Sequence, residues 1–218
     1  MTSPDFVSAD GSPLAVYLAL PAGDAPMLVH RAIRPESTIL ELGSGPGRLT
    51  RALVALGHDV TAVDDSPEML AHVTGADCVA ADAFELDLGR TFDVVLAAST
   101  LINRPGAEHR ARLLEVASRH LRDGGSFIVE RFEPGWLLSA TDTAEECGPV
   151  RMVFEAGAIT GSVRSAAMTY HLGGRSWRQE FDAEDLPDAV LEAEAAAVGL
   201  VVTRHLDDAG SWVGLTHR

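Results

Sequence analysis

The sequence predicts an α/β fold built on a doubly wound, mostly parallel seven-stranded sheet, with an antiparallel β meander inserted after the fifth strand. Short apolar runs alternate with helical patterns as far as Phe132, which is typical of a parallel sheet covered by helices on both faces. One apolar run ends in a glycine-rich turn, as strands do at the ligand sites of such sheets. After Pro134, strand-like runs are separated only by short glycine-containing turns, which indicates the meander.

Local chemistry sets the boundaries of the elements in the first part of the chain. We expect strands at 38–42, 59–63, 78–80, 92–97 and 126–132, and helices at 27–34, at 48–56, from Ser66-Pro67 onward and at 107–121. Pro35 and Gly57 end the first two helices, because proline cannot continue a helix and glycine favours its C-terminal stop. Ser66 is a good helix cap, and Gly124-Gly125 are expected to stop the last of these helices.

The second part of the chain is expected to form the meander and to complete the sheet. Its predicted strands are 150–159, 162–171 and 175–181, followed by a helix at 187–198 and final strands at 200–206 and 211–216. No linker composition separates the meander from the rest. We therefore expect one domain, 1–218, in which residues 134–182 form a loop and β-meander flap at the substrate site.

The composition narrows the classes of partner. The 218 residues carry a net charge of -15, with 32 acidic residues against 17 basic ones, all of them arginine. Such acidity opposes binding to nucleic acid, which needs clustered cations. Without a long apolar run or a secretory signal pattern, a cytoplasmic protein with no membrane partner is expected. Cys78 and Cys147 lie far apart and the histidines lack ligand spacing, so we expect neither a disulfide framework nor a metal site.

A glycine turn follows the first strand, where residues 39–50 are ILELGSGPGRLT. Gly43, Gly45 and Gly47 allow backbone angles that a Cβ forbids, and they let the chain approach a ligand closely. Dinucleotide sites favour the spacing GxGxxG, but here Arg48 stands at the position of the third glycine. The spacing argues against an NAD-dependent oxidoreductase, although the turn alone leaves the cofactor open.

Three carboxylates near strand ends help to choose the cofactor. Glu41 lies within an apolar strand, where a buried carboxylate needs a partner such as a cofactor's ammonium group. Asp64 ends the second strand and can accept both hydroxyls of a ribose, while Asp82 follows the third strand and can accept an adenine amino group. Each has a structural alternative: a salt bridge beneath the sheet for Glu41, a helix cap for Asp64 and a loop acid for Asp82.

Four segments together resemble class I S-adenosylmethionine-dependent methyltransferases, which have a Rossmann-like fold. They are ELGSGPG at 41–47, VDDSPEML at 63–70, ADAFEL at 81–86 and FDVVLAAS at 92–99. The late hairpin at 200–216 is similar to the antiparallel final strand of that family. The resemblance covers residues 27–132 and the C-terminal end, and it implies S-adenosylmethionine as the cofactor and S-adenosylhomocysteine as its product.

The resemblance also implies which residues bind the cofactor. This set is Glu41, Gly43, Ser44, Gly45, Gly47, Asp64, Asp65, Met69, Asp82, Ala83 and Ala98. The glycines would approach the methionine part, and Glu41 and the backbone carbonyl of Ala98 would hold its ammonium group. The ribose hydroxyls would bind to Asp64.

The adenine would lie near Met69, with Asp82 and Ala83 at its amino group and ring edge. One residue departs from the family pattern. Asp65 stands where the family usually has an apolar residue on the adenine face, and its carboxylate is expected to turn to solvent.

The methyl acceptor is expected over the carboxyl ends of the fourth and fifth strands. The candidate acceptor-binding residues are Tyr17, Asn103, Arg131, Trp136 and Trp177. Asn103 orients a polar group or caps a helix, and Arg131 binds a carboxylate or pairs with the glutamate before it. Trp136 is a lid or a packed anchor. Tyr17 would close the site from the N-terminal side, and Trp177 lies on the meander, where substrate walls are often built.

These features predict an enzyme that transfers a methyl group to nitrogen or oxygen of a small molecule. Residues 97–100 are AAST, where DNA-amine methyltransferases carry an Asn/Asp-Pro-Pro-aromatic motif. A general base is needed only if the acceptor binds protonated, and Tyr170 and His171 are the candidates. The alternatives are a peptide or protein methyltransferase with a cationic target, a protein that uses S-adenosylmethionine without methylating, and an NAD-dependent oxidoreductase. A monomer or a homodimer is expected.

Overall fold

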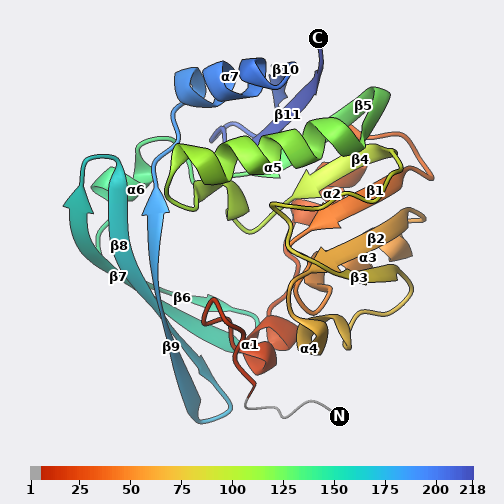
Figure 1. Cartoon of the computed structure of the whole chain (residues 1–218). Helices are drawn as coiled ribbons and strands as arrows, with labels where there is room; N and C mark the ends of the chain where they lie inside the picture. The colour runs from red at the N-terminus through yellow and green to blue at the C-terminus, as the bar shows by residue number, and fades with distance from the viewer. Residues whose placement is uncertain (1–5) are drawn as a thin grey trace.

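The computed structural model describes residues 6–218 and contains the predicted, mostly parallel sheet (Figure 1). Its strands are β1 (Thr38–Leu42), β2 (Asp59–Asp64), β3 (Asp77–Ala80), β4 (Phe92–Ala97), β5 (Leu121–Glu130), β10 (Leu200–His205) and β11 (Trp212–His217). Their order is β3-β2-β1-β4-β5-β11-β10, and β11 runs antiparallel to both of its neighbours. The predicted fold class is confirmed. The order reverses between β1 and β4, which is where sheets of this kind bind ligands.

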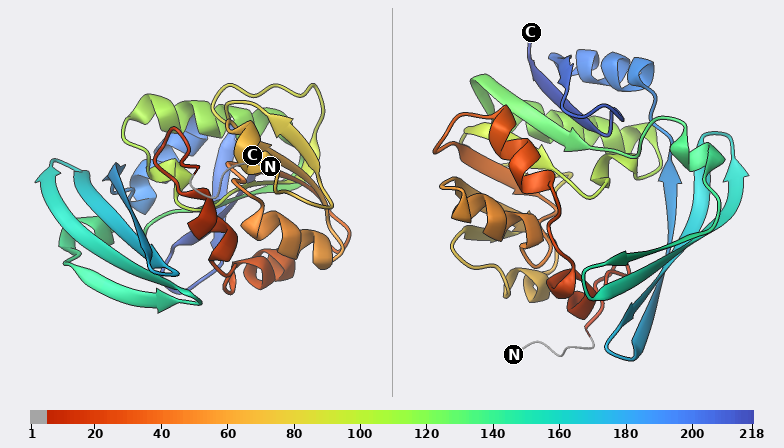
Figure 2. Two further views of the ribbon diagram at one scale, coloured as in Figure 1. Left: turned by 90° about the horizontal axis from the view of Figure 1, so that it is seen from below. Right: turned by 180° about the vertical axis from the view of Figure 1, so that it is seen from behind.

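Helices cover both faces of this sheet, because its central strands are apolar on both sides (Figure 2). One face packs against α5 (Ala107–His120) and α7 (Asp188–Ala197), and the other packs against α2 (Ala25–Ala32) and α3 (Arg48–Ala55). Within β1, Leu40 and Leu42 belong to the α5 side and Ile39 to the α3 side. Strand alternation therefore turns Glu41 toward α3.

A second sheet follows β5 and forms the predicted antiparallel meander. Its order is β6-β7-β8-β9, with β6 (Thr143–Cys147), β7 (Val150–Thr160), β8 (Val163–Leu172) and β9 (Arg175–Glu184). The sequence predicted neither β6 nor the short helix α6 (Trp136–Ser139). β6 is an edge strand that is mostly exposed along its length, so it lacks the alternation that identifies a half-buried strand.

The junction between α5 and β5 differs from the prediction. The glycine pair was expected to stop the helix, but α5 ends at His120 and β5 begins at Leu121. Gly124 has a φ of 72°, and a Cβ on Gly125 would lie 2.8 Å from the carbonyl oxygen of Asp93. The pair lies inside β5, where the register against β4 shifts, and close packing requires glycine there.

The N-terminal segment joins the two sheets. Helix α1 (Leu14–Ala19), which the sequence did not predict, packs Val16 against Val150 and Tyr170 of the meander. Figure 2 shows this helix between the meander and the parallel sheet. Within residues 6–218, every helix is too short or too polar to cross a membrane.

Candidate functional site: a cavity at the strand ends

A cavity of about 240 Å³ lies at the carboxyl ends of β1, β2 and β4. Its wall contains every residue of the expected cofactor set except Gly47, and it also contains Tyr17 from the expected acceptor set. The motif residues meet because parallel strands end at the same edge of a sheet. Further residues complete the wall: Ser8, Asp10, Ser12, Pro46, Arg48, Leu49, Phe84, Ser99, Leu101 and Arg104.

The glycine turn forms the floor of this cavity. Gly43 and Gly45 have φ angles of 71° and 55°, in the left-handed region that favours glycine. A Cβ on Gly45 would meet no heavy atom within 4 Å, so the backbone there is open to the cavity. Gly47 differs from the expectation: it lies outside the cavity wall, and a Cβ there would come within 3.0 Å of Val73. Its left-handed φ of 80° and the packing beneath the turn both favour glycine at this position.

Asp64 fixes the glycine turn from the end of β2. One oxygen accepts a hydrogen bond from the Gly45 amide at 2.7 Å, and the other accepts one from the Ser66 amide at 3.0 Å. Burial raises the pKa of Asp64, although both amides favour its ionised form. Each oxygen keeps a further lone pair for a ligand hydroxyl. Ser66 itself caps the short helix α4 (Pro67–Leu70), accepting from the Met69 amide at 3.2 Å.

Glu41 is a buried carboxylate at the base of the cavity, with only 3% of its surface exposed. The Thr50 hydroxyl on α3 donates to it at 2.6 Å. Burial raises the pKa of Glu41 to about 7, against the opposing effects of Thr50 and the charge of Arg48. Its hydrogen-bond donor is thus a neutral hydroxyl, which leaves the carboxylate able to gain from a cationic ligand.

The end of the cavity beside Met69 has a more apolar wall, with fewer kinds of chemical group. Met69 and Ala83 are buried there, and Phe84 joins them in the wall. The Asp82 carboxylate accepts a hydrogen bond from the Phe84 amide at 2.8 Å, which fixes the turn after β3. Asp65 lines the cavity but is exposed to solvent. A planar ring with an amino group at its edge suits such surroundings.

A strained turn follows β4 at the opposite wall. Ser99 and Thr100 have φ angles of 56° and 57°, which are unusual for residues other than glycine. The Ser99 amide donates to Glu130 of β5 at 2.6 Å, and burial raises the pKa of that glutamate. The surroundings impose this conformation, as they do for strained residues at functional sites. It leaves Ala98 and Ser99 on the cavity wall.

The N-terminal turn, residues 8–12, covers the cavity from outside the sheet. The Asp10 carboxylate accepts hydrogen bonds from the Ser12 amide at 3.0 Å and the Ser12 hydroxyl at 2.9 Å. Gln179 of β9 donates to the backbone oxygen of Asp10 at 3.0 Å and to Ser12 at 3.2 Å. The contact joins residues at opposite ends of the chain, so no local pattern predicts it.

Two expected acceptor residues have structural roles instead. Asn103 is buried: it donates to the backbone oxygen of Glu184 at 2.9 Å and accepts from the Phe132 amide at 3.0 Å. Arg131 is 1% exposed, donates to the carbonyls of Gly210 and Leu186, and pairs with Asp188. Neither residue lines the cavity. Their donors are used within the fold, where they fasten the strand ends to the meander and to α7.

The two expected tryptophans also lie outside the cavity wall. Trp136 is packed as an anchor: its ring stacks on Phe132 at 5.3 Å and lies 5.3 Å from Phe154. Trp177 packs against the cluster of α1 and the meander, with the guanidinium of Arg175 over its ring. Of the expected acceptor set, the structure therefore places Tyr17 alone at the cavity.

The two candidate bases are not suited to that role. Tyr170 is buried, its hydroxyl donates to Gln179 at 3.1 Å, and burial raises its pKa above the usual range. His171 is exposed and bonded to Ser176 at 2.7 Å. Because successive residues of a strand point to opposite faces, His171 faces away from the side on which Tyr170 meets α1.

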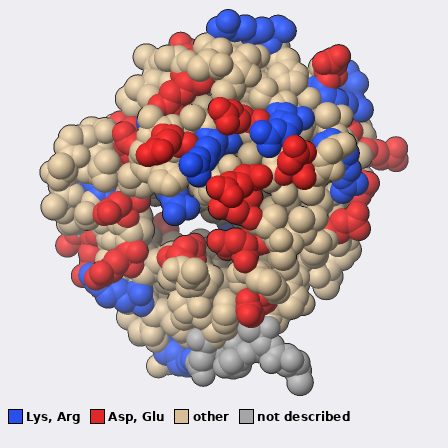
Figure 3. All heavy atoms as spheres, viewed as in Figure 1, with Lys and Arg blue, Asp and Glu red and all other residues tan. Residues whose placement is uncertain are grey.

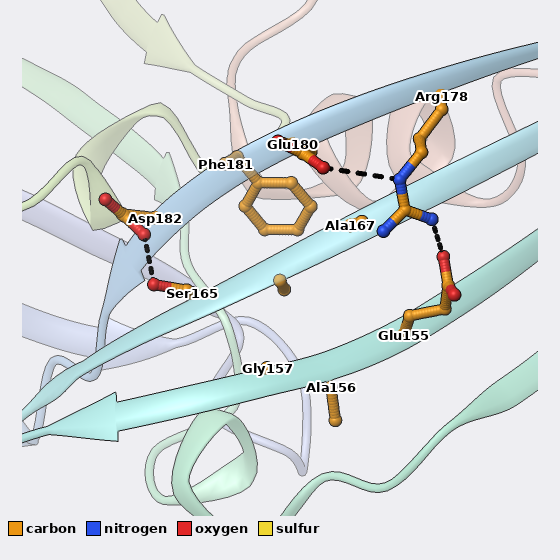
Figure 4. Close-up of a pocket in the computed structure, with 10 residues that line it drawn as sticks. Glu155, Ala156, Gly157, Ser165, Ala167, Arg178, Glu180, Phe181 and Asp182 are labelled. Atoms are coloured by element: carbon orange, nitrogen blue, oxygen red, sulfur yellow. Dashed lines mark hydrogen bonds and ion pairs between the residues drawn. The ribbon is translucent and has the colours of Figure 1, made fainter.

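A wider hollow of about 700 Å³ lies on the outer face of the meander (Figure 4). Arg178 reaches between Glu155 and Glu180, and Ser165 donates to Asp182 at 2.6 Å. These polar groups satisfy one another, and the hollow shares no residue with the cavity at the strand ends. The chemistry of the motif residues is therefore confined to the strand-end cavity.

The cavity fits S-adenosylmethionine in the kinds of groups that it presents. Glu41 and the carbonyl of Ala98 suit an ammonium group, Asp64 suits the ribose hydroxyls, and Asp82 suits the adenine amino group. The buried hydroxyl of Ser44 has no hydrogen-bond partner within the described residues, although it lines the same wall. A buried polar group without a partner is costly unless a ligand satisfies it.

Comparison with known proteins agrees with this chemistry. A family model described as a methyltransferase domain matches residues 40–129. The sugar N-methyltransferase KedS8 from Streptoalloteichus sp. is 27% identical over 90% of this chain and 87% of its own, with a TM-score of 0.72.

Two further solved structures have the same fold. The CcbJ methyltransferase from Streptomyces caelestis is 24% identical over 91% of this chain and 97% of its own, with a TM-score of 0.75. The amino pentose methyltransferase CalS10 from Micromonospora echinaspora, solved with S-adenosylmethionine bound, is 20% identical over 94% of both chains, with a TM-score of 0.72.

The matched segment runs from β1 to β5 and contains the glycine turn, the acids at the strand ends and the turn after β4. The strand order of the sheet and the residues that line the cavity point to the same kind of protein. The chain contains a methyltransferase domain and has the fold of class I methyltransferases, and it is an enzyme whose methyl donor is S-adenosylmethionine.

Proposed function

We propose that this enzyme methylates the nitrogen of a small-molecule amine, and that the acceptor is an amino sugar or a similar amine. The observation that carries the proposal is the charge of the cavity. Asp10, Asp65 and Asp82 lie on its wall, in addition to Glu41 and Asp64. Figure 3 shows acidic side chains, with arginine side chains among them, around an opening between the meander and the parallel sheet. An acidic wall favours a cationic acceptor such as a protonated amine.

The comparisons support the same class of acceptor. KedS8 is described as a sugar N-methyltransferase and CalS10 as an amino pentose methyltransferase. The acidic wall also argues against acceptors that carry a carboxylate or a phosphate, because like charges would oppose their entry. We further propose a single domain that acts in the cytoplasm as a monomer or a homodimer, with the meander as the outer cover of the acceptor site.

In the proposed reaction the protein mainly positions the acceptor and excludes water. The bound cofactor supplies a methyl group that the sulfonium has already activated. Asp64 and Glu41 fix the donor end, and Tyr17 with the N-terminal turn covers the cavity. Orientation of this kind contributes on the order of 7–11 kcal/mol to lowering the barrier. The acceptor amine attacks in its neutral form, so a protonated acceptor must first release its proton to bulk water.

A labelled-methyl assay tests the proposal with matched acceptors. Amino sugars and the same sugars with a hydroxyl in place of the amine are offered with radiolabelled S-adenosylmethionine, beside phenols, carboxylates and basic peptides. Label is expected on the amino sugars and not on their hydroxyl counterparts. Label on the hydroxyl compounds would contradict nitrogen as the acceptor atom, and label on the peptides alone would favour a protein methyltransferase. If S-adenosylhomocysteine binds but no acceptor is labelled, the cofactor serves another reaction.

A further inference from the structure

Arg48 is a cation in a cavity whose wall is otherwise mainly acidic. It is the first residue of α3 and is half-buried. Its guanidinium donates to the carbonyl of Pro21 at 3.1 Å and to the Ser99 hydroxyl at 3.3 Å. Both partners are neutral oxygens. A guanidinium has five N–H donors, so these two bonds leave donors for a ligand.

The position of Arg48 separates it from the other cation on the wall. Arg104 lies over the ring of Phe84, 5.4 Å from its centroid, at the end of the cavity that contains Asp82. Arg48 instead contacts Ser99, beside Ala98, and its charge acts on Glu41 and Glu130. It therefore belongs to the end of the cavity that suits an ammonium group.

The amino-acid end of S-adenosylmethionine carries a carboxylate as well as an ammonium group. Near Glu41 and Glu130 a carboxylate would meet two like charges, so it requires a cation close by. We propose that Arg48 binds the carboxylate of the cofactor and so fixes its amino-acid end. Since the same guanidinium contacts Pro21 and Ser99, a bound carboxylate would also stabilise the loop after α1 and the strained turn after β4.

Calorimetry with two ligands that differ at one group tests this assignment. The ligands are S-adenosylhomocysteine and its carboxamide, in which the carboxylate is replaced by a neutral amide. The charge-removing variant Arg48→Gln should lower the affinity for S-adenosylhomocysteine by about 10- to 100-fold, as expected for a charge-assisted hydrogen bond. The affinity of this variant for the carboxamide should change by no more than about twofold. Arg48→Lys should recover part of the loss, because it restores the charge without the planar fork.

Arg104→Ala is the matched control, since it removes the other cation of the wall. It should shift the affinities for both ligands by the same factor. If Arg48→Gln weakened both ligands equally, Arg48 would support the cavity wall and the proposal would be wrong. The wild-type protein gives an answer even if that variant does not fold. It should prefer S-adenosylhomocysteine over the carboxamide by a similar 10- to 100-fold, and equal affinity for the two would overturn the assignment.

Discussion

Glu41 shows how one buried residue couples the cofactor site to pH. Its carboxyl lies on the α3 side of β1, with the Thr50 hydroxyl as its hydrogen-bond donor. Burial raises its pKa from 4.5 to about 7, so the free protein holds a proton there that the unfolded chain has already released. An ammonium group beside it favours the ionised form. Binding of the cofactor is therefore expected to release a proton below pH 7.

The affinity for S-adenosylhomocysteine should rise as the pH increases from about 5.5 and level off above the pKa of about 7. Calorimetry in buffers of different ionisation enthalpy measures the released proton directly. Glu41→Gln should bind S-adenosylhomocysteine more weakly and show no rise, while Glu68→Gln, at an exposed position of α4, should keep the wild-type profile. A flat wild-type profile would contradict the coupling. In the free protein the same shift makes stability fall as the pH rises from 4.5 through 7, because the folded state binds more protons there.

At the scale of elements, the meander acts on the cavity through the N-terminal turn. None of its described residues lines the cavity, yet Gln179 of β9 donates to Asp10 and Ser12 and accepts from the Tyr170 hydroxyl. Beside these hydrogen bonds, the ring of Tyr17 of α1 lies edge-on to that of Tyr170, with ring centroids 6.3 Å apart. The meander is thus fastened to the segment that covers the cofactor.

Gln179→Ala should release S-adenosylhomocysteine about three- to tenfold faster, because each lost neutral hydrogen bond contributes about 0.5–1.5 kcal/mol. Stopped-flow displacement measures this rate. Tyr170→Phe should have a smaller effect, since it leaves both donors of Gln179 in place. Ser165→Ala, on the outer face of the meander, should leave the rate unchanged. A lower unfolding temperature for Gln179→Ala with an unchanged rate would assign Gln179 to stability alone.

The sequence predicted the elements whose chemistry is local. Strands β1 and β4 have the predicted bounds, because each is a short apolar run with clear ends. The residues expected to bind the cofactor, apart from Gly47, line one cavity, since each motif is attached to a strand end. The failures concern contacts between distant segments. Close packing against β4 explains why glycine stands at 125. Arg131 is held by the carbonyls of residues 186 and 210, and the sequence around Arg131 does not reveal these contacts.

The acceptor side could not be predicted for the same reason. Asn103, Trp136 and Trp177 are residue types that often bind substrates, but here Glu184, Phe154 and the residues of α1 are among their partners, and these lie outside each residue's local sequence. The N-terminal turn carries no motif, and its place at the cavity depends on Gln179, more than 160 residues later.

At the scale of the whole molecule, the buried His58 and the partly buried His30 contribute to how stability responds to acid. His30 of α2 and His58 before β2 approach with their ring nitrogens 2.9 Å apart, on the sheet face opposite α5. Burial lowers the pKa of His58, and the neighbouring charge of His30 lowers it further. The folded state therefore takes up a proton less readily than the unfolded chain does.

Stability should consequently decrease as the pH falls from 6.5 toward the lowered pKa of His58. This slope opposes that of Glu41, so the two must be separated with variants. Urea unfolding should be measured between pH 5 and pH 8. The Glu41→Gln variant should show the decrease in unfolding free energy at low pH, and the double variant that adds His58→Gln should not. The exposed His171→Gln serves as the control and should keep the slope. If stability still decreased at low pH without His58, another group would be responsible for the decrease.

The fastening of the meander to α1 has a consequence for engineering and for divergence within such enzymes. The meander leaves the parallel sheet after β5 and returns before α7, so it has the form of an exchangeable cassette. Its contacts with Val16, Asp10 and Ser12 mean that the cassette has a second piece at the other end of the chain. A graft of residues 143–184 from a relative with another acceptor would therefore need residues 8–20 from the same donor, and a chimaera that moves one without the other would leave its cofactor cavity poorly covered.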